Sequence, residues 1–263
     1  MTNLTNLVQF AQQLSRSAGT QLVQAYQQQS SSNINRRESP KAMKLLEDST
    51  IDQWLVQHIH ATYPDHSILT EESGLLYNTD QSSYRWIIDP IDGSVNFSNH
   101  NPFFAISMAV QINGVLEIGI IEAPLLGEQF VAVRGHGATV NGQPIRVSTT
   151  AKLQQAYVLS CDGGMTDRTQ VFSTLIRNYY DQVIDFRKLG SAALECAWVA
   201  SGRADGYITM AIDPWDIAAG VVLIEEAGGQ VTTFHGEPWQ AQQLDVIASN
   251  GLLHQAFMDR IWD

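Results

Sequence analysis

The amino-acid sequence predicts a mixed α/β fold, in which helices and sheets form a layered sandwich. Its first half holds apolar strand segments joined by short turns, as in an antiparallel sheet, and its second half alternates strands with helices. The antiparallel first half favours a layered sandwich over a Rossmann sheet. No repeat or low-complexity linker separates the halves, so we expect one domain over residues 1–263, with packed halves at about 1–150 and 151–263.

The first half begins with an expected amphipathic helix, because apolar residues recur at helical spacing from Leu4 to Tyr26. Residues 30–47 are polar and contain Pro40, which predicts a surface loop before a second helix at about 48–60. Four apolar segments are then expected to be strands, at 67–70, 84–89, 103–112 and 115–123.

The second half reads as alternating elements after two Asn-Gly hairpin turns, at 113–114 and 141–142. Helices are expected at 166–180, 190–201, 215–227 and the C-terminus. Strands are expected at 156–160, 182–186, 205–210, 230–234 and 244–248.

Composition narrows the class of protein. A hydrophobic content of 44% with 16% charged residues indicates a globular chain. The net charge of −12 argues against a nucleic-acid partner, although bound cations would let an acidic protein take an anionic substrate. Cys161 and Cys196 are too few for a disulfide framework and read as reduced, buried thiols. The sequence shows no signal peptide and no membrane span, so a cytoplasmic protein without a membrane partner is expected.

The strongest chemical signal is the segment from Asp89 to Ser94, DPIDGS, directly after an apolar strand. A tight turn stiffened by Pro90 would aim Asp89 and Asp92 at one point, and hard cations such as Mg²⁺ prefer such oxygen ligands. The amides of Gly93 and Ser94 would open a helical turn and hold a phosphate oxygen. The alternative is a capped loop, in which both aspartates only accept hydrogen bonds from turn amides.

Two further acidic sites support a cation centre. Glu71 and Glu72 end a predicted strand, where two adjacent carboxylates are badly placed unless a cation lies there; an exposed strand end is the alternative. Asp216 lies in the first turn of an apolar helix, where an acid is also favoured by the helix dipole alone, by about 0.3–1 kcal/mol.

Together, the segments TEES at 70–73, DPIDGSVNF at 89–97 and PWDIAAGVVLIEEAGG at 214–229 resemble the inositol monophosphatase family over essentially the whole chain. The resemblance implies the αβαβα sandwich of the sugar phosphatases. It also implies a lithium-sensitive phosphatase that uses two or three Mg²⁺ ions, with Mn²⁺ as a substitute, and a homodimer. We therefore expect hydrolysis of a small phosphorylated polyol by metal-activated water, without a serine or cysteine nucleophile.

The resemblance also implies roles for individual residues. Glu71, Asp89 and the Ile91 carbonyl would bind the first cation. Asp89, Asp92 and Asp216 would bind the second. Glu71, with Ser94, would orient the attacking water.

Further positions follow from the same resemblance. Asp48 falls near a weaker third cation site, although its flanking residues match the family poorly, and Arg37 stands where the family has a lysine. The segment expected to line the substrate is Gly190, Ser191 and Ala192. The remaining residues expected at the substrate are Asp92, Gly93, Ser94, Thr209 and Asp216.

The sequence leaves more than one phosphate ester as a candidate substrate. Thr209 stands seven residues before Asp216, where animal members of the family have a glutamate that holds inositol hydroxyls. We expect inositol 1-phosphate or a related sugar phosphate, with fructose 1,6-bisphosphate as the first alternative and adenosine 3′,5′-bisphosphate and histidinol phosphate behind it. An inactive metal-binding regulatory protein is the alternative of a different class, disfavoured because all four acids are present.

Overall fold

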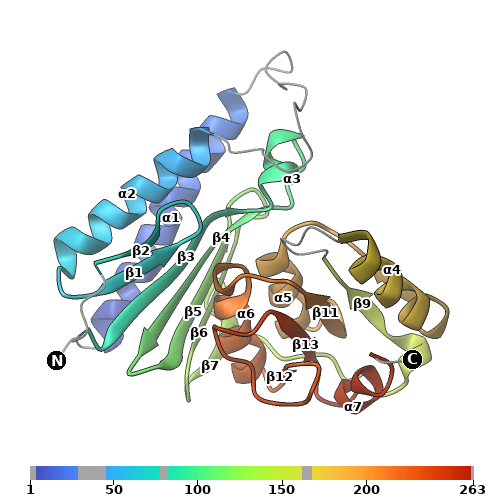
Figure 1. The fold of residues 1–263 in the computed structure, drawn as a ribbon. Coiled ribbons are helices and arrows are strands. Elements are labelled where there is room, and N and C mark those ends of the chain that lie inside the picture. The colour runs from blue at the N-terminus through green and yellow to red at the C-terminus, as the bar shows by residue number, and fades with distance from the viewer. Residues whose placement is uncertain (1–3, 29–45, 78–81, 162–167, 262–263) are drawn as a thin grey trace.

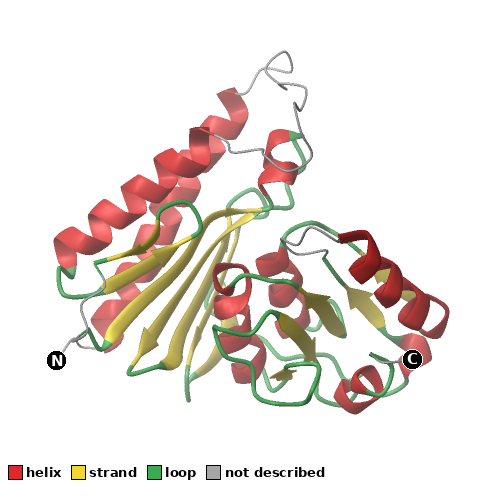
Figure 2. Ribbon diagram, in the orientation of Figure 1, coloured by secondary structure: helices red, strands yellow, loops and turns green. Residues whose placement is uncertain are grey.

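The computed structural model describes residues 4–28, 46–77, 82–161 and 168–261. Most of the expected loop at 30–47, with Arg37, lies outside the described residues. Figure 1 shows two helices on one face of a large sheet, two central helices between this sheet and a smaller one, and two helices on the far face of the smaller sheet. This order of layers is the predicted αβαβα sandwich, and Figure 2 separates the helical layers from the strand layers by colour.

The helices agree with the predicted segments within a few residues. Their bounds are α1 Leu4–Gln28, α2 Leu46–Thr62, α3 Ser94–Ser98, α4 Arg168–Tyr179, α5 Ala192–Ala200, α6 Pro214–Glu226 and α7 His254–Met258, with 3-10 turns η1 Leu153–Gln155 and η2 Tyr180–Gln182. Among the described residues, no helix is both long and apolar enough to cross a membrane.

The large sheet has eight strands in the order β2-β1-β3-β4-β5-β6-β7-β8. All of its neighbouring pairs are antiparallel except β1 with β3. The strands are β1 Ser67–Thr70, β2 Gly74–Leu76, β3 Tyr84–Asp92, β4 Ala105–Ile112, β5 Val115–Ala123, β6 Glu128–Val133, β7 Gly137–Val140 and β8 Gln143–Pro144.

The smaller sheet has the order β10-β9-β11-β13-β12, with β9 parallel to both of its neighbours. Its strands are β9 Tyr157–Leu159, β10 Asp185–Arg187, β11 Gly206–Met210, β12 Gln230–Thr232 and β13 Asp245–Ser249. The two sheets fall in the first and second halves of the chain, as the sequence predicted.

Three hydrophobic clusters hold the five layers together, because each sheet buries both of its faces. The alternation along β3 shows this directly: Trp86 and Ile88 pack toward α1 and α2, and Ile87 packs toward α5 and α6. The central layer is closely packed, because a Cβ atom at Gly119 of β5 would lie 2.4 Å from the Ala219 carbonyl oxygen of α6. The middle of α6 is therefore packed closely against the large sheet.

Two local features differ from the prediction. The strand expected to end at Asp89 continues as β3 to Asp92, through Pro90. In addition, β2, β6, β7 and β8 were not predicted, although the Asn141-Gly142 turn that joins β7 to β8 was. β2, β7 and β8 are short and give a weak apolar pattern, which explains their omission.

Candidate active site

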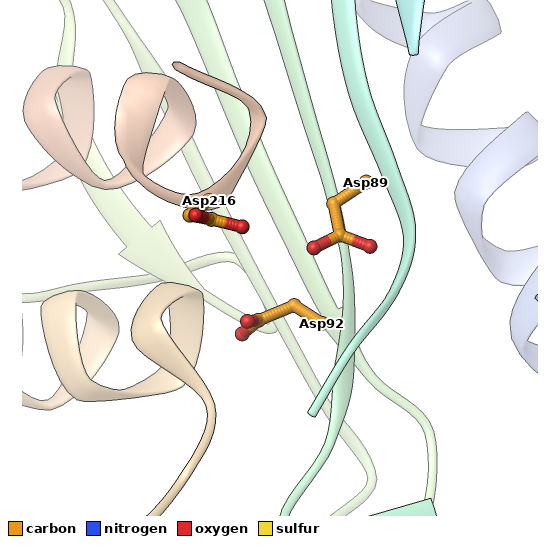
Figure 3. Close-up of side chains that lie close together, drawn as sticks. All are labelled: Asp89, Asp92 and Asp216. Carbon is orange, nitrogen blue, oxygen red and sulfur yellow. The ribbon is translucent and has the colours of Figure 1, made fainter. Parts of the chain in front are cut away.

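Three aspartates converge between the large sheet and the central helices. Asp89, Asp92 and Asp216 each place a carboxylate oxygen within 4.8 Å of the others. Asp89 and Asp92 are almost fully buried, at 2% and 6% exposure. Figure 3 shows Asp89 on β3 and Asp216 at the start of α6, with the Asp92 carboxylate directed toward the start of α5.

A β-bulge in β3 brings Asp89 and Asp92 to the same side of the sheet. Side chains three residues apart on a regular strand point to opposite faces. Here Asp89 pairs with Ser107 and Asp92 pairs with Ala105. Moving three residues along β3 therefore corresponds to moving only two residues along β4, so β3 contains one extra residue. The extra residue re-aims the Asp92 side chain, a common role of bulges next to functional sites. Pro90, which cannot donate to the ladder, lies inside this irregular stretch.

Asp89 and Asp216 also make local hydrogen bonds, as a turn cap and a helix cap would. The Ile91 N–H donates to Asp89 Oδ1 at 2.9 Å, and the Asp213 N–H donates to Asp216 Oδ2 at 3.1 Å. These bonds fix the side-chain positions and do not compete with cation binding, because a carboxylate has about four lone-pair sites. The Ser107 hydroxyl, which donates to the Trp215 carbonyl at 3.0 Å, ties the start of α6 to β4.

Asp92 accepts hydrogen bonds from the N-terminus of α5. The Ser191 hydroxyl donates to Asp92 Oδ2, and the amides of Ala192 and Ala193 donate at 3.1 and 2.8 Å. Ser191 is also the N-cap of this helix. An anionic group at a helix N-terminus is stabilised by the free amides and by the helix dipole. Gly190, Ser191 and Ala192, predicted to line the substrate, therefore lie beside Asp92, and Ser191 is used to hold it.

Glu71 joins the cluster from the end of β1. Its N–H donates to the Ile88 carbonyl at 3.2 Å, and its solvent-exposed side chain comes within hydrogen-bonding reach of Asp89, a contact that requires one of the two carboxyl groups to hold a proton. Desolvation raises the pKa of Glu71 to about 7, with added repulsion from Glu72 and Asp92, although the hydrogen bond to Asp89 acts in the opposite direction. A carboxylate pKa near neutrality suits a group that exchanges a proton with water.

The electrostatics of the site favour a cation. Burial raises the pKa of Asp92 to about 6, and burial followed by repulsion from the other acids raises those of Asp89 and Asp216 well above their usual range. In the described part of the chain, no lysine or arginine forms an ion pair with these three aspartates. Buried carboxylates are stable only when protonated, paired or bound to a metal. An all-oxygen donor set of this kind fits Mg²⁺ or Mn²⁺.

These shifts predict how the stability of the metal-free protein depends on pH. The folded-state pKa values of Glu71 and Asp92, about 7 and about 6, lie above the ordinary values of 4.5 and 3.8. The stabilisation that these two groups contribute when protonated is therefore fully present below about pH 4. It is lost as the pH rises through about 6 to 7. In EDTA, we expect the free energy of unfolding to fall by on the order of 1–2 kcal/mol between pH 5 and pH 8, mostly through the buried Asp92, because the Glu71 side chain is solvent-exposed and its contribution is screened.

Saturating Mg²⁺ should cancel that loss, because the ionised carboxylates bind the cation and the folded state gains the binding free energy. The measurement is Tm against pH with EDTA and with Mg²⁺. Glu122 and His254, which also have shifted pKa values, titrate in both series, so the difference between the curves isolates the site. Parallel curves would contradict a cation centre at these aspartates.

The DPIDGS loop is packed closely against the α5 side of the site. Gly93 has φ +91°, and a Cβ atom there would lie 3.0 Å from the Gly190 carbonyl oxygen and 3.1 Å from that of Phe103. Only glycine fits this position. Ser94 then begins the short helix α3 at the edge of the site, and Ile91 is buried in the bulge. The roles of the Ile91 carbonyl and the Ser94 hydroxyl stay predictions.

Two predicted residues lie farther back. Asp48 is buried on α2 and contributes to the repulsion at Asp89, so it faces the same region from the outer helical layer. Thr209 is fully buried in β11, where its hydroxyl donates to the Cys161 carbonyl at 2.7 Å. Its side chain is thus bonded within the smaller sheet, and its influence on substrate choice stays a prediction.

Sequence reasoning missed three polar residues around the site. Asp213, half-buried at the start of α6, adds negative charge next to Glu71 and Asp216. Asn96, which donates to the carbonyls of Phe103 and Leu189, joins α3 to the turn before α5. Glu195 is a fully buried acid in the otherwise apolar first turns of α5, and that contrast was the signal in the sequence.

Comparisons with known proteins identify the family of this αβαβα sandwich, in which three aspartates converge between the large sheet and the central helices. The model of the inositol monophosphatase family matches residues 3–263. The fructose-1,6-bisphosphatase/inositol-1-monophosphatase of Thermotoga maritima is 39% identical over 222 residues, 84% of this chain and 83% of that protein. The Nus factor SuhB of Escherichia coli is 37% identical over 220 residues, 82% of this chain and 81% of that protein.

Solved structures agree as well. The inositol monophosphatase of Anabaena (Nostoc) sp. PCC 7120 superposes with a TM-score of 0.87 at 33% identity, covering 99% of this chain and 97% of that one. The chain belongs to the inositol monophosphatase family, a family of phosphatases. This confirms both the resemblance drawn from the TEES, DPIDGS and PWDIAA segments and the predicted fold.

Proposed function

We propose that the protein hydrolyses a phosphate monoester of a small polyol in a reaction that depends on Mg²⁺. The observation that carries the proposal is the convergence of the buried Asp89 and Asp92 and the half-buried Asp216 within 4.8 Å, without a basic partner in the described chain. Such a cluster is costly unless a cation compensates it. Hydrolysis of phosphate monoesters needs one of the largest barrier reductions known, which cations supply by neutralising the phosphoryl oxygens and lowering the pKa of water.

In this proposal, the acidic residues hold the cations and position the attacking water. Glu71, Asp89 and the Ile91 carbonyl would hold one cation, and Asp89, Asp92 and Asp216 would hold a second, with the bulge and the α5 amides keeping the aspartates in place. Glu71, whose pKa is raised to about 7, accepts a proton from the attacking water, with the Ser94 hydroxyl orienting that water. The amides of Gly93 and Ser94 hold a phosphate oxygen. Asp48 contributes to a weaker third cation site.

For the substrate, we propose inositol 1-phosphate or a related sugar phosphate, with fructose 1,6-bisphosphate as the second candidate. The second candidate is supported by a relative that is named for both activities.

A non-catalytic role is the competing proposal, since another relative is named a Nus factor. The retained acids Glu71, Asp89, Asp92 and Asp216 argue for catalysis. Sensitivity to lithium and a homodimeric state are expected from the family alone.

The test is kcat/KM for inositol 1-phosphate, fructose 1,6-bisphosphate, adenosine 3′,5′-bisphosphate and histidinol phosphate at saturating Mg²⁺. We expect the highest values for the first two, since a relative is named for both activities. Turnover of none of the four esters would favour the non-catalytic role.

A further inference from the structure

The turn Leu189-Gly190, directly before α5, is held by a buried carboxyl group. Glu195 Oε1 accepts hydrogen bonds from the amides of Leu189 at 2.7 Å and Gly190 at 3.0 Å. Glu195 is fully buried, and its neighbours in α5 are almost all apolar. A buried carboxyl is costly for stability, so its two main-chain bonds are the interactions that compensate it here.

The same turn is held from its other side by Asn96 of α3. Asn96 Nδ2 donates to the Leu189 carbonyl at 2.8 Å and to the Phe103 carbonyl at 2.7 Å. The turn is therefore clamped between two elements: Glu195 holds its N–H groups, and Asn96 holds its carbonyl. Asn96 lies two residues after Ser94, so the clamp joins the DPIDGS loop to α5.

The clamped turn determines where the N-terminus of α5 lies. The next residues, Ser191, Ala192 and Ala193, donate the hydrogen bonds that Asp92 accepts. The Gly190 carbonyl also sets the space around Gly93. A displaced turn would move the donors of Asp92 and the wall beside Gly93 together.

We propose that Glu195 is a positioning residue, which, with Asn96, clamps the Leu189-Gly190 turn so that α5 holds Asp92 in the geometry needed for cation binding. This inference rests on the proposed cation site, and it assigns Glu195 no contact with substrate or cation. Residues that orient metal ligands in this way typically change metal affinity or activity by about 10- to 100-fold when they are removed.

Glutamine is an informative substitute at this position. Burial raises the pKa of Glu195 well above its usual range, so a neutral side chain of the same shape is a close replacement. Glutamine keeps the oxygen that accepts the two amides. Glu195 Oε2 has no hydrogen-bond partner among the described residues, so the added NH₂ group lowers stability without breaking the clamp.

The experiment compares Glu195→Ala and Glu195→Gln with a matched control, Glu122→Ala. Glu122 is also a buried carboxyl, hydrogen-bonded to Gln129 on the α1 side of the large sheet, away from the aspartates. Two quantities are measured in the full chain without substrate: the Kd for Mn²⁺ by calorimetry, and hydrogen exchange of the peptide that contains Leu189 and Gly190. We expect Glu195→Ala to weaken Mn²⁺ binding and to speed exchange, each by about tenfold or more.

Glu195→Gln should keep both quantities within about threefold of wild type, and Glu122→Ala should lower Tm without changing either. If Glu195→Ala fails to fold, Asn96→Ala removes the other half of the clamp and should weaken Mn²⁺ binding by a similar factor. Equal losses of Mn²⁺ affinity in Glu195→Gln and Glu195→Ala would show that the charge of Glu195, and not its hydrogen bonds to the turn, supports cation binding. Unchanged Mn²⁺ affinity in Glu195→Ala, or in Asn96→Ala, would also overturn the inference. A wild type that binds no Mn²⁺ refutes the cation site instead, and the exchange data still test the clamp.

Discussion

Replacing Asp89 with asparagine should lower kcat/KM at least about 1000-fold at saturating Mg²⁺, which corresponds to about 4 kcal/mol of transition-state stabilisation. Asp89 lies at the centre of the acidic cluster, where Glu71, Asp92 and Asp216 all add to its repulsion. Asparagine keeps the oxygen that accepts the Ile91 N–H, so the turn is retained and the charge is lost. Without metal, the variant should melt at the same or a higher temperature, because one repelling carboxylate is gone.

Asp205→Asn is the matched control for this change. Asp205 is also buried and also accepts a main-chain bond, from Tyr157 N at 2.7 Å, but it lies at the start of β11 outside the cluster. We expect it to lose stability and to keep its kcat/KM. An Asp89→Asn variant that retains more than a tenth of wild-type kcat/KM would show that Asp89 is a turn cap and no ligand.

Gly93→Ala should inactivate the protein while most of the fold survives. The new Cβ atom would meet the carbonyl oxygens of Gly190 and Phe103 at 3.0 and 3.1 Å, and both belong to the backbone and cannot move aside cheaply. The strain at φ +91° and these contacts together should destabilise the protein by about 2–4 kcal/mol. The displaced loop carries Asp92 and Ser94, so kcat should fall about 100-fold or more.

Gly114→Ala separates backbone strain from crowding. Gly114 has a similar φ, +85°, but a Cβ atom there would have no neighbour within 4 Å. We expect a loss of only about 1–2 kcal/mol and unchanged kcat. Equal effects of the two substitutions on kcat would show that close packing around Gly93 does not position the site.

Much of this fold was readable from the sequence because its strongest patterns are local. The helix α1 follows from apolar spacing, and the antiparallel run β4-β5 follows from two apolar segments around Asn113-Gly114. The bulge in β3 was not predicted, because Pro90 after a strand reads equally well as a turn. Whether a strand continues past such a residue depends on its pairing with β4, which is a tertiary property.

The acids of the site were predicted from their motifs, but their supports were not. Asp92 accepts hydrogen bonds from residues about 100 positions later in the chain, and no local pattern predicts such a pairing. Asn96 had no reason to be singled out until the structure placed it against Leu189. For Thr209, the family resemblance implied a role in substrate choice, whereas its hydroxyl is bonded to the Cys161 carbonyl. That burial makes Thr209→Glu a poor test of selectivity, because the added carboxylate would be desolvated.

The most direct test of a cation-dependent phosphatase is phosphate release from inositol 1-phosphate and fructose 1,6-bisphosphate by chelated protein, before and after Mg²⁺ is restored. The cluster of Asp89, Asp92 and Asp216 has no lysine or arginine partner in the described chain, so it predicts no turnover in EDTA and recovery of full activity with excess Mg²⁺. Undiminished phosphate release after exhaustive chelation would contradict the account.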